Sequence, residues 1–136
     1  MATYSITNAV AGVAVGRKPQ VVSVDLDCSS TTLTTADSIE VLEIPANTLV
    51  INAGIQVTLG SDGAADLSLG DDDTANQFVD AADGQNSGVT SVGTTAKLYT
   101  AADTLDLTSA TATFNGKVRV FATIVELPDE ADQTPA

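Results

Sequence analysis

The segment from Leu49 to Leu59 alternates apolar residues with polar or small ones at a period of two. Its odd positions are all apolar: Leu49, Ile51, Ala53, Ile55, Val57 and Leu59. Successive side chains of a β-strand point to opposite faces, so this spacing predicts a long strand with one buried face. Shorter stretches at 22–26, 67–69 and 105–107 repeat the pattern, and no window of helical length has an apolar stripe. The chain is therefore predicted to be all-β.

Turn signals separate about eight short strands, and no segment provides a crossover helix. This organisation predicts an antiparallel β-sandwich or a jelly-roll-like small barrel over residues 20–127. Residues 1–19 are expected to form an N-terminal arm, which either orders on a neighbouring molecule or adds a first strand to its own sheet. Residues 128–136 lack an apolar anchor and predict a flexible, disordered acidic tail.

Two local features sharpen the strand assignment. Residues 38–44 are rich in β-branched side chains and end at Pro45, which favours a strand over a helical turn capped by Asp37. The apolar pattern changes phase between Val41 and Leu42, as a β-bulge would require. The dipeptide Asn115-Gly116 is typical of a two-residue hairpin turn, which would place Phe114 opposite Lys117 and Leu107 opposite Ile124.

Composition excludes several classes of function. The 136 residues suit one domain, and 5 cations against 18 carboxylates give a net charge of −13. A chain this acidic cannot neutralise a run of phosphates, so we expect no nucleic-acid binding. The sequence has no His and a single Cys, which removes imidazole bases, His-ligated zinc and internal disulfides. No nucleophile stands beside a base, so an enzyme is not predicted.

The charge is also unevenly placed. No Lys or Arg lies between Lys18 and Lys97. The apolar stretch at 8–16 is too short to span a membrane, and Arg17 and Lys18 follow it instead of preceding it, so neither membrane insertion nor export is expected.

The densest acidic stretch, from Asp62 to Asp83, contains three consecutive carboxylates: Asp71, Asp72 and Asp73. Oxygen-rich loops of this kind can bind Ca²⁺. The consecutive spacing differs from the alternating ligands of an EF-hand loop, so a solvated turn is the competing interpretation. We therefore expect no cofactor and keep these three residues as candidate Ca²⁺ ligands.

The C-terminal strand is apolar on both faces over its second half. Val118, Val120, Ala122 and Ile124 share one face, while Phe121, Val125 and Leu127 lie on the other. A second apolar face is either central in a sandwich or covered by a partner. Phe121, Val125 and Leu127, together with the cations Arg17 and Lys18 of the arm, form the predicted protein interface.

Four segments share a pattern with a known family: residues 35–50, residues 69–73 leading to Phe78, residues 97–103 and residues 116–127. They resemble small virion proteins of tailed bacteriophages, often head decoration (cement) proteins. The resemblance covers roughly residues 20–127 in pattern and composition. It implies a sandwich or jelly roll that is made in the host bacterial cytoplasm and caps the capsid exterior of the virion.

The same resemblance implies a homotrimer that contacts the major capsid protein and stabilises the assembled head. The resemblance does not assign a known contact residue of the family to any position in this sequence. Two other functions remain open at this point. One is a phage tail or head-fibre component, and the other is a Ca²⁺-dependent carbohydrate- or cell-surface-binding β module.

Overall fold

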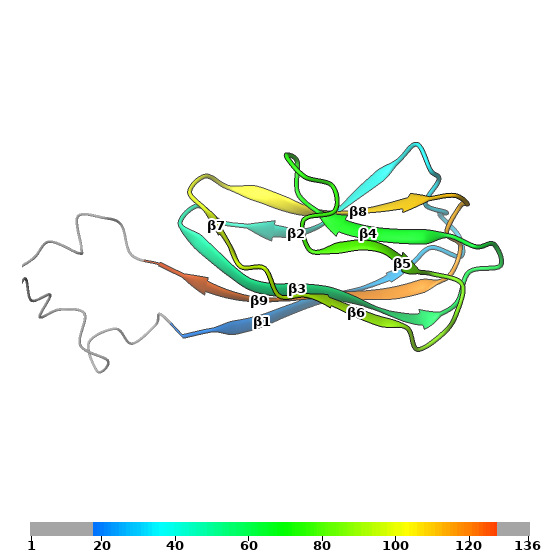
Figure 1. The fold of residues 1–136 in the computed structure, drawn as a ribbon, viewed down its shortest axis with the longest axis horizontal. Coiled ribbons are helices and arrows are strands. Elements are labelled where there is room, and N and C mark those ends of the chain that lie inside the picture. Colours follow the sequence, from blue (N-terminus) through cyan, green and yellow to red (C-terminus); the bar gives the residue numbers. More distant parts are fainter. Residues whose placement is uncertain (1–17, 128–136) are drawn as a thin grey trace, which may run out of the picture.

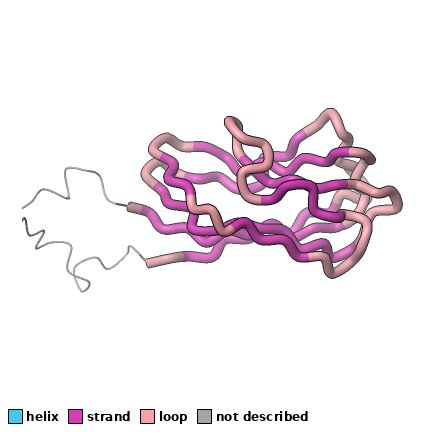
Figure 2. Tube along the Cα trace, in the orientation of Figure 1, coloured by secondary structure: helices cyan, strands magenta, loops and turns pink. Residues whose placement is uncertain are grey.

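The computed structural model describes residues 18–127, which form nine β-strands and no helix (Figures 1 and 2). The strands are β1 (Gln20–Asp27), β2 (Ser38–Ile44), β3 (Thr48–Leu59), β4 (Asp66–Gly70), β5 (Val79–Asp83), β6 (Thr90–Gly93), β7 (Lys97–Tyr99), β8 (Asp103–Ala110) and β9 (Lys117–Glu126). The prediction of an all-β chain is confirmed. The predicted tail, and the predicted arm apart from Lys18 and Pro19, lie outside the described residues.

The strands pair into two antiparallel sheets that pack face to face (Figure 1). The five-stranded sheet has the order β1-β9-β3-β6, with β7 also paired to β3, and the four-stranded sheet has the order β2-β8-β4-β5. Apart from β7, eight strands thus form two four-stranded sheets, as in a jelly roll. The predicted antiparallel sandwich is confirmed.

The core lies between the inner faces of the two sheets. Alternation along β9 turns Val118, Val120, Ala122 and Ile124 inward, where each is at most 7% exposed. Leu105 and Leu107 of β8 meet them from the opposite sheet and are fully buried. Burial of side chains of this size stabilises the fold by about 1.5–3 kcal/mol each.

The predicted hairpin at Asn115-Gly116 is wrong. β8 pairs with β2 and β4, whereas β9 pairs with β1 and β3, so the connection crosses from one sheet to the other. Phe114 forms an isolated bridge with Leu33, and the Asn115 side chain accepts hydrogen bonds from Ser61 Oγ and the Asp62 amide, both at 2.9 Å. Asn115 therefore caps the β3–β4 loop instead of closing a two-residue turn.

The long strand β3 is present, but the prediction of one continuous buried face is wrong. A bulge between Val50 and Asn52 shifts the pairing with β9, and a second one lies between Val57 and Leu59. Ala53, Ile55 and Val57 are buried, while Leu49 and Ile51 are half-buried and Leu59 is exposed. By contrast, the bulge predicted in β2 is confirmed, because the β2–β8 register shifts between Glu40 and Leu42.

Candidate functional site

The five-stranded sheet has an outer face, turned away from the core, whose composition changes along the strands. Gln20 pairs with Ile124, so β1 begins and β9 ends at the same end of this sheet, which we call the terminal end (Figure 1). The opposite end, where Asp27 pairs with Lys117, is the far end. The register places outward side chains in rows across the strands, from one end to the other.

Most of the apolar residues of the outer face lie in the rows near the terminal end, where they alternate with a few polar residues such as Thr123 and Asn52. Leu98, Leu49 and Val125 form the first row, across β7, β3 and β9. Val21 lies in the next row beside Thr123. Val92, Gly54 and Phe121 form the third row, across β6, β3 and β9. We call Val21, Leu49, Val92, Leu98, Phe121 and Val125 the apolar patch.

Phe121 sits on the patch because of a glycine. Gly54 pairs with Phe121, and a Cβ atom built on Gly54 would lie 2.9 Å from the Cζ atom of the Phe121 ring. The ring therefore covers the position where any other residue would place its side chain. An aromatic ring over a cross-strand glycine shields the exposed backbone and fixes the register.

The rows near the far end are charged and internally paired. Arg119 Nε donates to Asp25 Oδ1 at 2.7 Å, and the Lys117 ammonium lies 3.9 Å from the Asp27 carboxylate. The hydrogen bond from Arg119 is the largest influence on Asp25 and holds its pKa below the usual value. The outer face thus passes from apolar rows to neutralised ion pairs.

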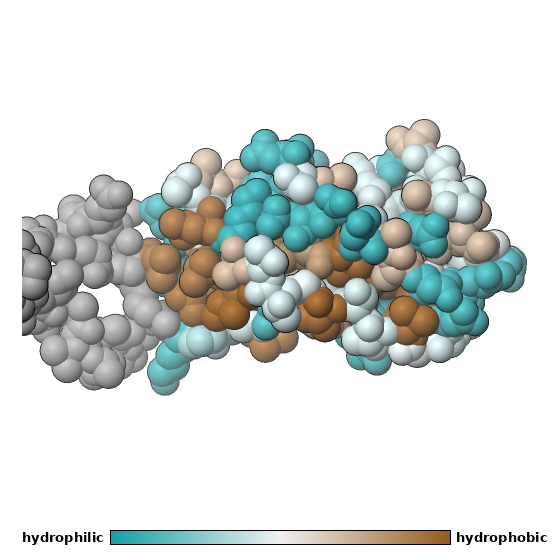
Figure 3. Space-filling view, in the orientation of Figure 1, coloured by the Kyte–Doolittle hydropathy of each residue, from teal (hydrophilic) through white to brown (hydrophobic). Residues whose placement is uncertain are grey.

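Much of the apolar patch is in contact with solvent. The exposed fractions are 73% for Val21, 48% for Leu98 and 45% for Val92. Figure 3 shows hydrophobic residues gathered toward the terminal end, while hydrophilic residues cover the β4–β5 loop above. Exposed apolar side chains that gather on one face mark interaction sites more often than scattered single residues do.

The predicted interface residues fall on or near this patch. Phe121 and Val125 are half-buried on the outer face, Leu127 follows β9 and is 37% exposed, and Lys18 is exposed ahead of β1. Arg17 lies outside the described residues. Sequence reasoning missed Val21, Leu49, Val92 and Leu98. Only the pairing of β1, β6 and β7 with their neighbours brings these side chains to the same face.

The four-stranded sheet differs sharply in charge. Its strands hold seven carboxylates and no Lys or Arg: Glu40, Glu43, Asp66, Asp80, Asp83, Asp103 and Asp106. The strands of the five-stranded sheet hold three carboxylates (Asp25, Asp27, Glu126) against three cations (Lys97, Lys117, Arg119). The excess negative charge of the described residues therefore belongs to the four-stranded sheet and the loops.

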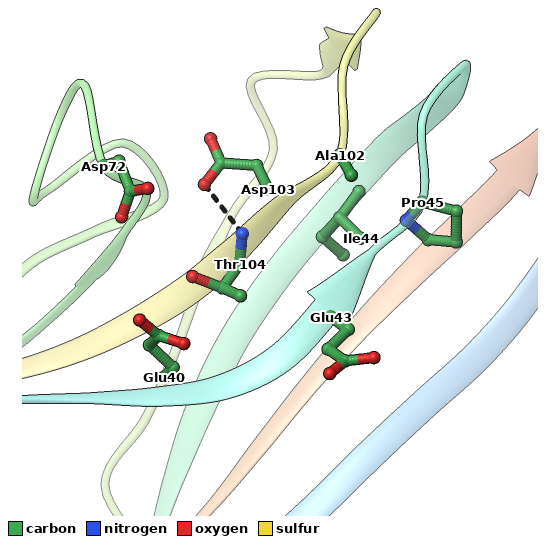
Figure 4. A pocket seen from close by; sticks show the side chains of 8 residues that line it. All are labelled: Glu40, Glu43, Ile44, Pro45, Asp72, Ala102, Asp103 and Thr104. Carbon is green, nitrogen blue, oxygen red and sulfur yellow. Dashed lines mark hydrogen bonds between the residues drawn. The ribbon is translucent and has the colours of Figure 1, made fainter.

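An acidic groove of about 490 Å³ lies at one end of β2 and β8 (Figure 4). Asp72 reaches it from the β4–β5 loop, Asp103 and Thr104 from β8, and Glu40 and Glu43 from β2. A hydrogen bond with the Asp106 carboxyl, together with the negative charge of that group, raises the pKa of Asp72. The groove therefore concentrates carboxylates that repel one another.

Asp71, a candidate Ca²⁺ ligand, is occupied by protein groups. Its Oδ2 atom accepts hydrogen bonds from the Lys97 ammonium and the Tyr99 hydroxyl, both at 2.6 Å, and the residue is only 3% exposed. Its Oδ1 atom accepts from the backbone amides of Asp73 and Thr74. Burial works to raise the pKa of Asp71, but these hydrogen bonds together hold it below the usual value.

This network ties the β4–β5 loop of the four-stranded sheet to β7 of the five-stranded sheet. Asp72 and Asp73, the other two candidates, are exposed. Within residues 18–127, no group of three or more acidic or thiol side chains is arranged to hold a metal ion. The same residues form only strands and their connections, so none of them makes a membrane-spanning helix.

Comparison with known proteins finds similarity at the level of structure. No protein-family model and no curated protein sequence matches the chain. A chain of the cyanophage Pam1 capsid asymmetric unit superposes with a TM-score of 0.66 and 25% identity, covering 88% of this chain and 92% of that chain.

Two further chains come from phage capsids. One belongs to the acidic stable capsid structure of Helicobacter pylori bacteriophage KHP30, with a TM-score of 0.62, 15% identity and coverage of 85% of this chain and 92% of that chain. The other belongs to the capsid of Ralstonia phage GP4, with a TM-score of 0.63, 16% identity and coverage of 85% and 89%. These two show the shared fold. The Pam1 chain, at 25% identity, supports a structural role in a phage virion.

Proposed function

We propose that this chain is a head decoration (cement) protein. It binds the outer surface of an assembled phage head, contacts the major capsid protein and stabilises the shell without enzymatic activity. The observation that carries the proposal is the likeness to a chain of the Pam1 capsid, which extends over 88% of this chain and 92% of that one. A single sandwich domain of this size suits attachment to a finished lattice.

The stabilisation follows from mass action. A protein that binds the assembled lattice and not its separated subunits lowers the free energy of the lattice by an amount that grows with its own concentration. At a concentration about 100 times its dissociation constant, the gain is about 2.7 kcal/mol per site. Many such sites on one shell oppose its disruption together.

The terminal end is the part of the molecule that we assign to the head. β1 begins and β9 ends there as paired neighbours, and Arg17 and Lys18 precede β1 in the chain. The carboxylates of the four-stranded sheet would face water in this arrangement. We further propose a homo-oligomer, with a trimer favoured, because symmetric association repeats the same contact around the axis.

Co-sedimentation with purified heads of the parent virus tests this proposal. The wild-type chain should sediment with heads and saturate at a fixed number of copies per head. Lys18→Glu should weaken binding several-fold, because it reverses a charge at the terminal end. Lys117→Glu makes the same change at the far end of the same sheet and should bind like the wild type. A wild-type chain that stays in the supernatant contradicts the proposal.

A further inference from the structure

The proposed contact with the head does not account for the apolar patch, which needs a surface to cover it. The patch draws on five strands: β7, β3 and β9 supply its first row, β1 supplies Val21, and β6 and β9 supply Val92 and Phe121 on either side of Gly54. Val21, Val92 and Leu98 expose 73%, 45% and 48% of their surface. Sheet faces that gather exposed apolar side chains bury them against a second layer in stable structures.

Charge distinguishes the faces by which two copies of this chain can approach. The strands of the four-stranded sheet carry seven carboxylates and no cation, and the loops add the exposed carboxylates Asp37, Asp62, Asp72 and Asp73. Two such faces repel each other. On the outer face of the five-stranded sheet, two carboxylates and two cations form the pairs Asp25–Arg119 and Asp27–Lys117. This face can meet its own copy without like-charge repulsion.

We propose that a second copy of this chain covers the apolar patch. Copies turn the outer faces of their five-stranded sheets toward a common symmetry axis, so that Val21, Val92, Leu98 and Phe121 of each copy line a shared apolar core. The acidic four-stranded sheets then point away from the axis and lie as far apart as the assembly allows. Either a dimer or a trimer satisfies this arrangement, since each repeats one face about one axis.

The inference rests on the homo-oligomer of the proposed function and names the face by which its copies meet. It concerns association in solution and does not depend on heads being present. Two other occupants are outcomes of the test. If the major capsid protein covers the patch, the free chain is monomeric and patch variants lose head binding. If residues 1–17 of the same chain cover it, the free chain is monomeric and patch variants keep head binding. Both outcomes overturn the proposal.

The native mass of the full-length chain, measured by light scattering during gel filtration, tests the proposal with a matched pair of variants. Leu98 and Leu59 are both 48% exposed and both belong to the five-stranded sheet, but Leu98 lies on the patch and Leu59 at the far end. The wild type should run as an oligomer. Leu98→Lys should weaken association at least tenfold, because each copy would place a charge in the shared core. Leu59→Lys should associate like the wild type.

A wild-type chain that is monomeric at about 100 µM would overturn the proposal, because it would gain less than about 5.5 kcal/mol from association. An equal response to the two variants would also overturn it. Val92→Lys provides a second patch variant, and unchanged melting of each variant shows that the fold is intact. Co-sedimentation is a separate measurement, so an oligomer that ignores heads contradicts the proposed function alone.

Discussion

The two sheets of the sandwich share one core but have different outer surfaces. Inward, both follow the same rule: alternate residues are apolar and buried, as at Val120 in β9 and Leu107 in β8. Outward, the five-stranded sheet carries the apolar patch and balanced charges, whereas the four-stranded sheet carries carboxylates without a cation. The core requires only the inner faces, so the outer difference points to different surroundings, protein on one side and water on the other.

The same comparison shows how one charge type can have opposite effects. Asp25 of β1 is stabilised as a carboxylate by Arg119, and its pKa lies below the usual value. Asp72 of the β4–β5 loop faces the Asp106 carboxyl, and its pKa lies above the usual value. The negative charge of Asp25 therefore favours the folded state, whereas that of Asp72 opposes it.

The largest effect is expected where the two sheets are joined. Asp71→Ala should lower the free energy of unfolding by about 2–4 kcal/mol, because it leaves the Lys97 ammonium and the Tyr99 hydroxyl without their partner. Asp73→Ala, two residues away on the exposed loop, should change it by less than about 0.5 kcal/mol. Urea denaturation at neutral pH measures both, and equal losses would contradict the assigned role of Asp71.

Acid should remove the contribution of Asp71. The folded-state pKa of Asp71 is lowered, so its stabilisation is present above the usual carboxyl range and is lost as the pH falls through the folded value. The difference between the wild type and Asp71→Ala should therefore shrink in acid. A difference that is independent of pH would indicate that packing, not the ion pair, holds the loop.

A smaller effect is expected on the outer face of the five-stranded sheet. Phe121→Ala should lower the free energy of unfolding by about 1–2 kcal/mol, because the half-buried ring no longer covers Gly54. Thermal or urea unfolding measures the loss. Val21→Ala, on the same face but 73% exposed, should be close to neutral in the monomer. Similar losses of unfolding free energy for the two variants would contradict the role assigned to the Phe121 ring over Gly54.

The smallest effects should have opposite signs on the two sheets. At low ionic strength, Asp72→Asn should raise the melting temperature, because it removes a carboxylate that faces Asp106. Its raised pKa means that the wild type loses stability as the pH rises through the folded value, and the variant should not show this loss. Asp25→Asn should lower the melting temperature by removing the partner of Arg119. Shifts of the same sign would contradict the electrostatic contrast between the sheets.

Alternation alone predicted the inner faces and not the outer contacts. The inward set Val118, Val120, Ala122 and Ile124 and the bulge in β2 followed from local patterns, because both depend on the period of two. The prediction of a hairpin at Asn115-Gly116 was wrong. Turn propensity depends on the local sequence alone and does not show that the next strand joins the other sheet. The prediction that the odd residues of β3 share one buried face was wrong, because a bulge reverses which side chains point inward.

The candidate sites depended still more on tertiary structure. The partners of Asp71, Lys97 and Tyr99, are 26 and 28 residues away in the chain. The local sequence therefore showed only three consecutive carboxylates, a pattern that suggests an ion site. The apolar patch includes single residues from short strands, such as Val92 and Leu98. Only the register with β3 shows that they share a face with Phe121.

The thermal stability of heads tests the central claim most directly. Purified heads of the parent virus are heated with and without the full-length chain, and light scattering or DNA release reports the temperature of disruption. If the chain is a decoration protein, the disruption temperature rises with its concentration and levels off when the sites are filled. A disruption temperature that stays the same at saturating concentrations of the chain would contradict the proposed function.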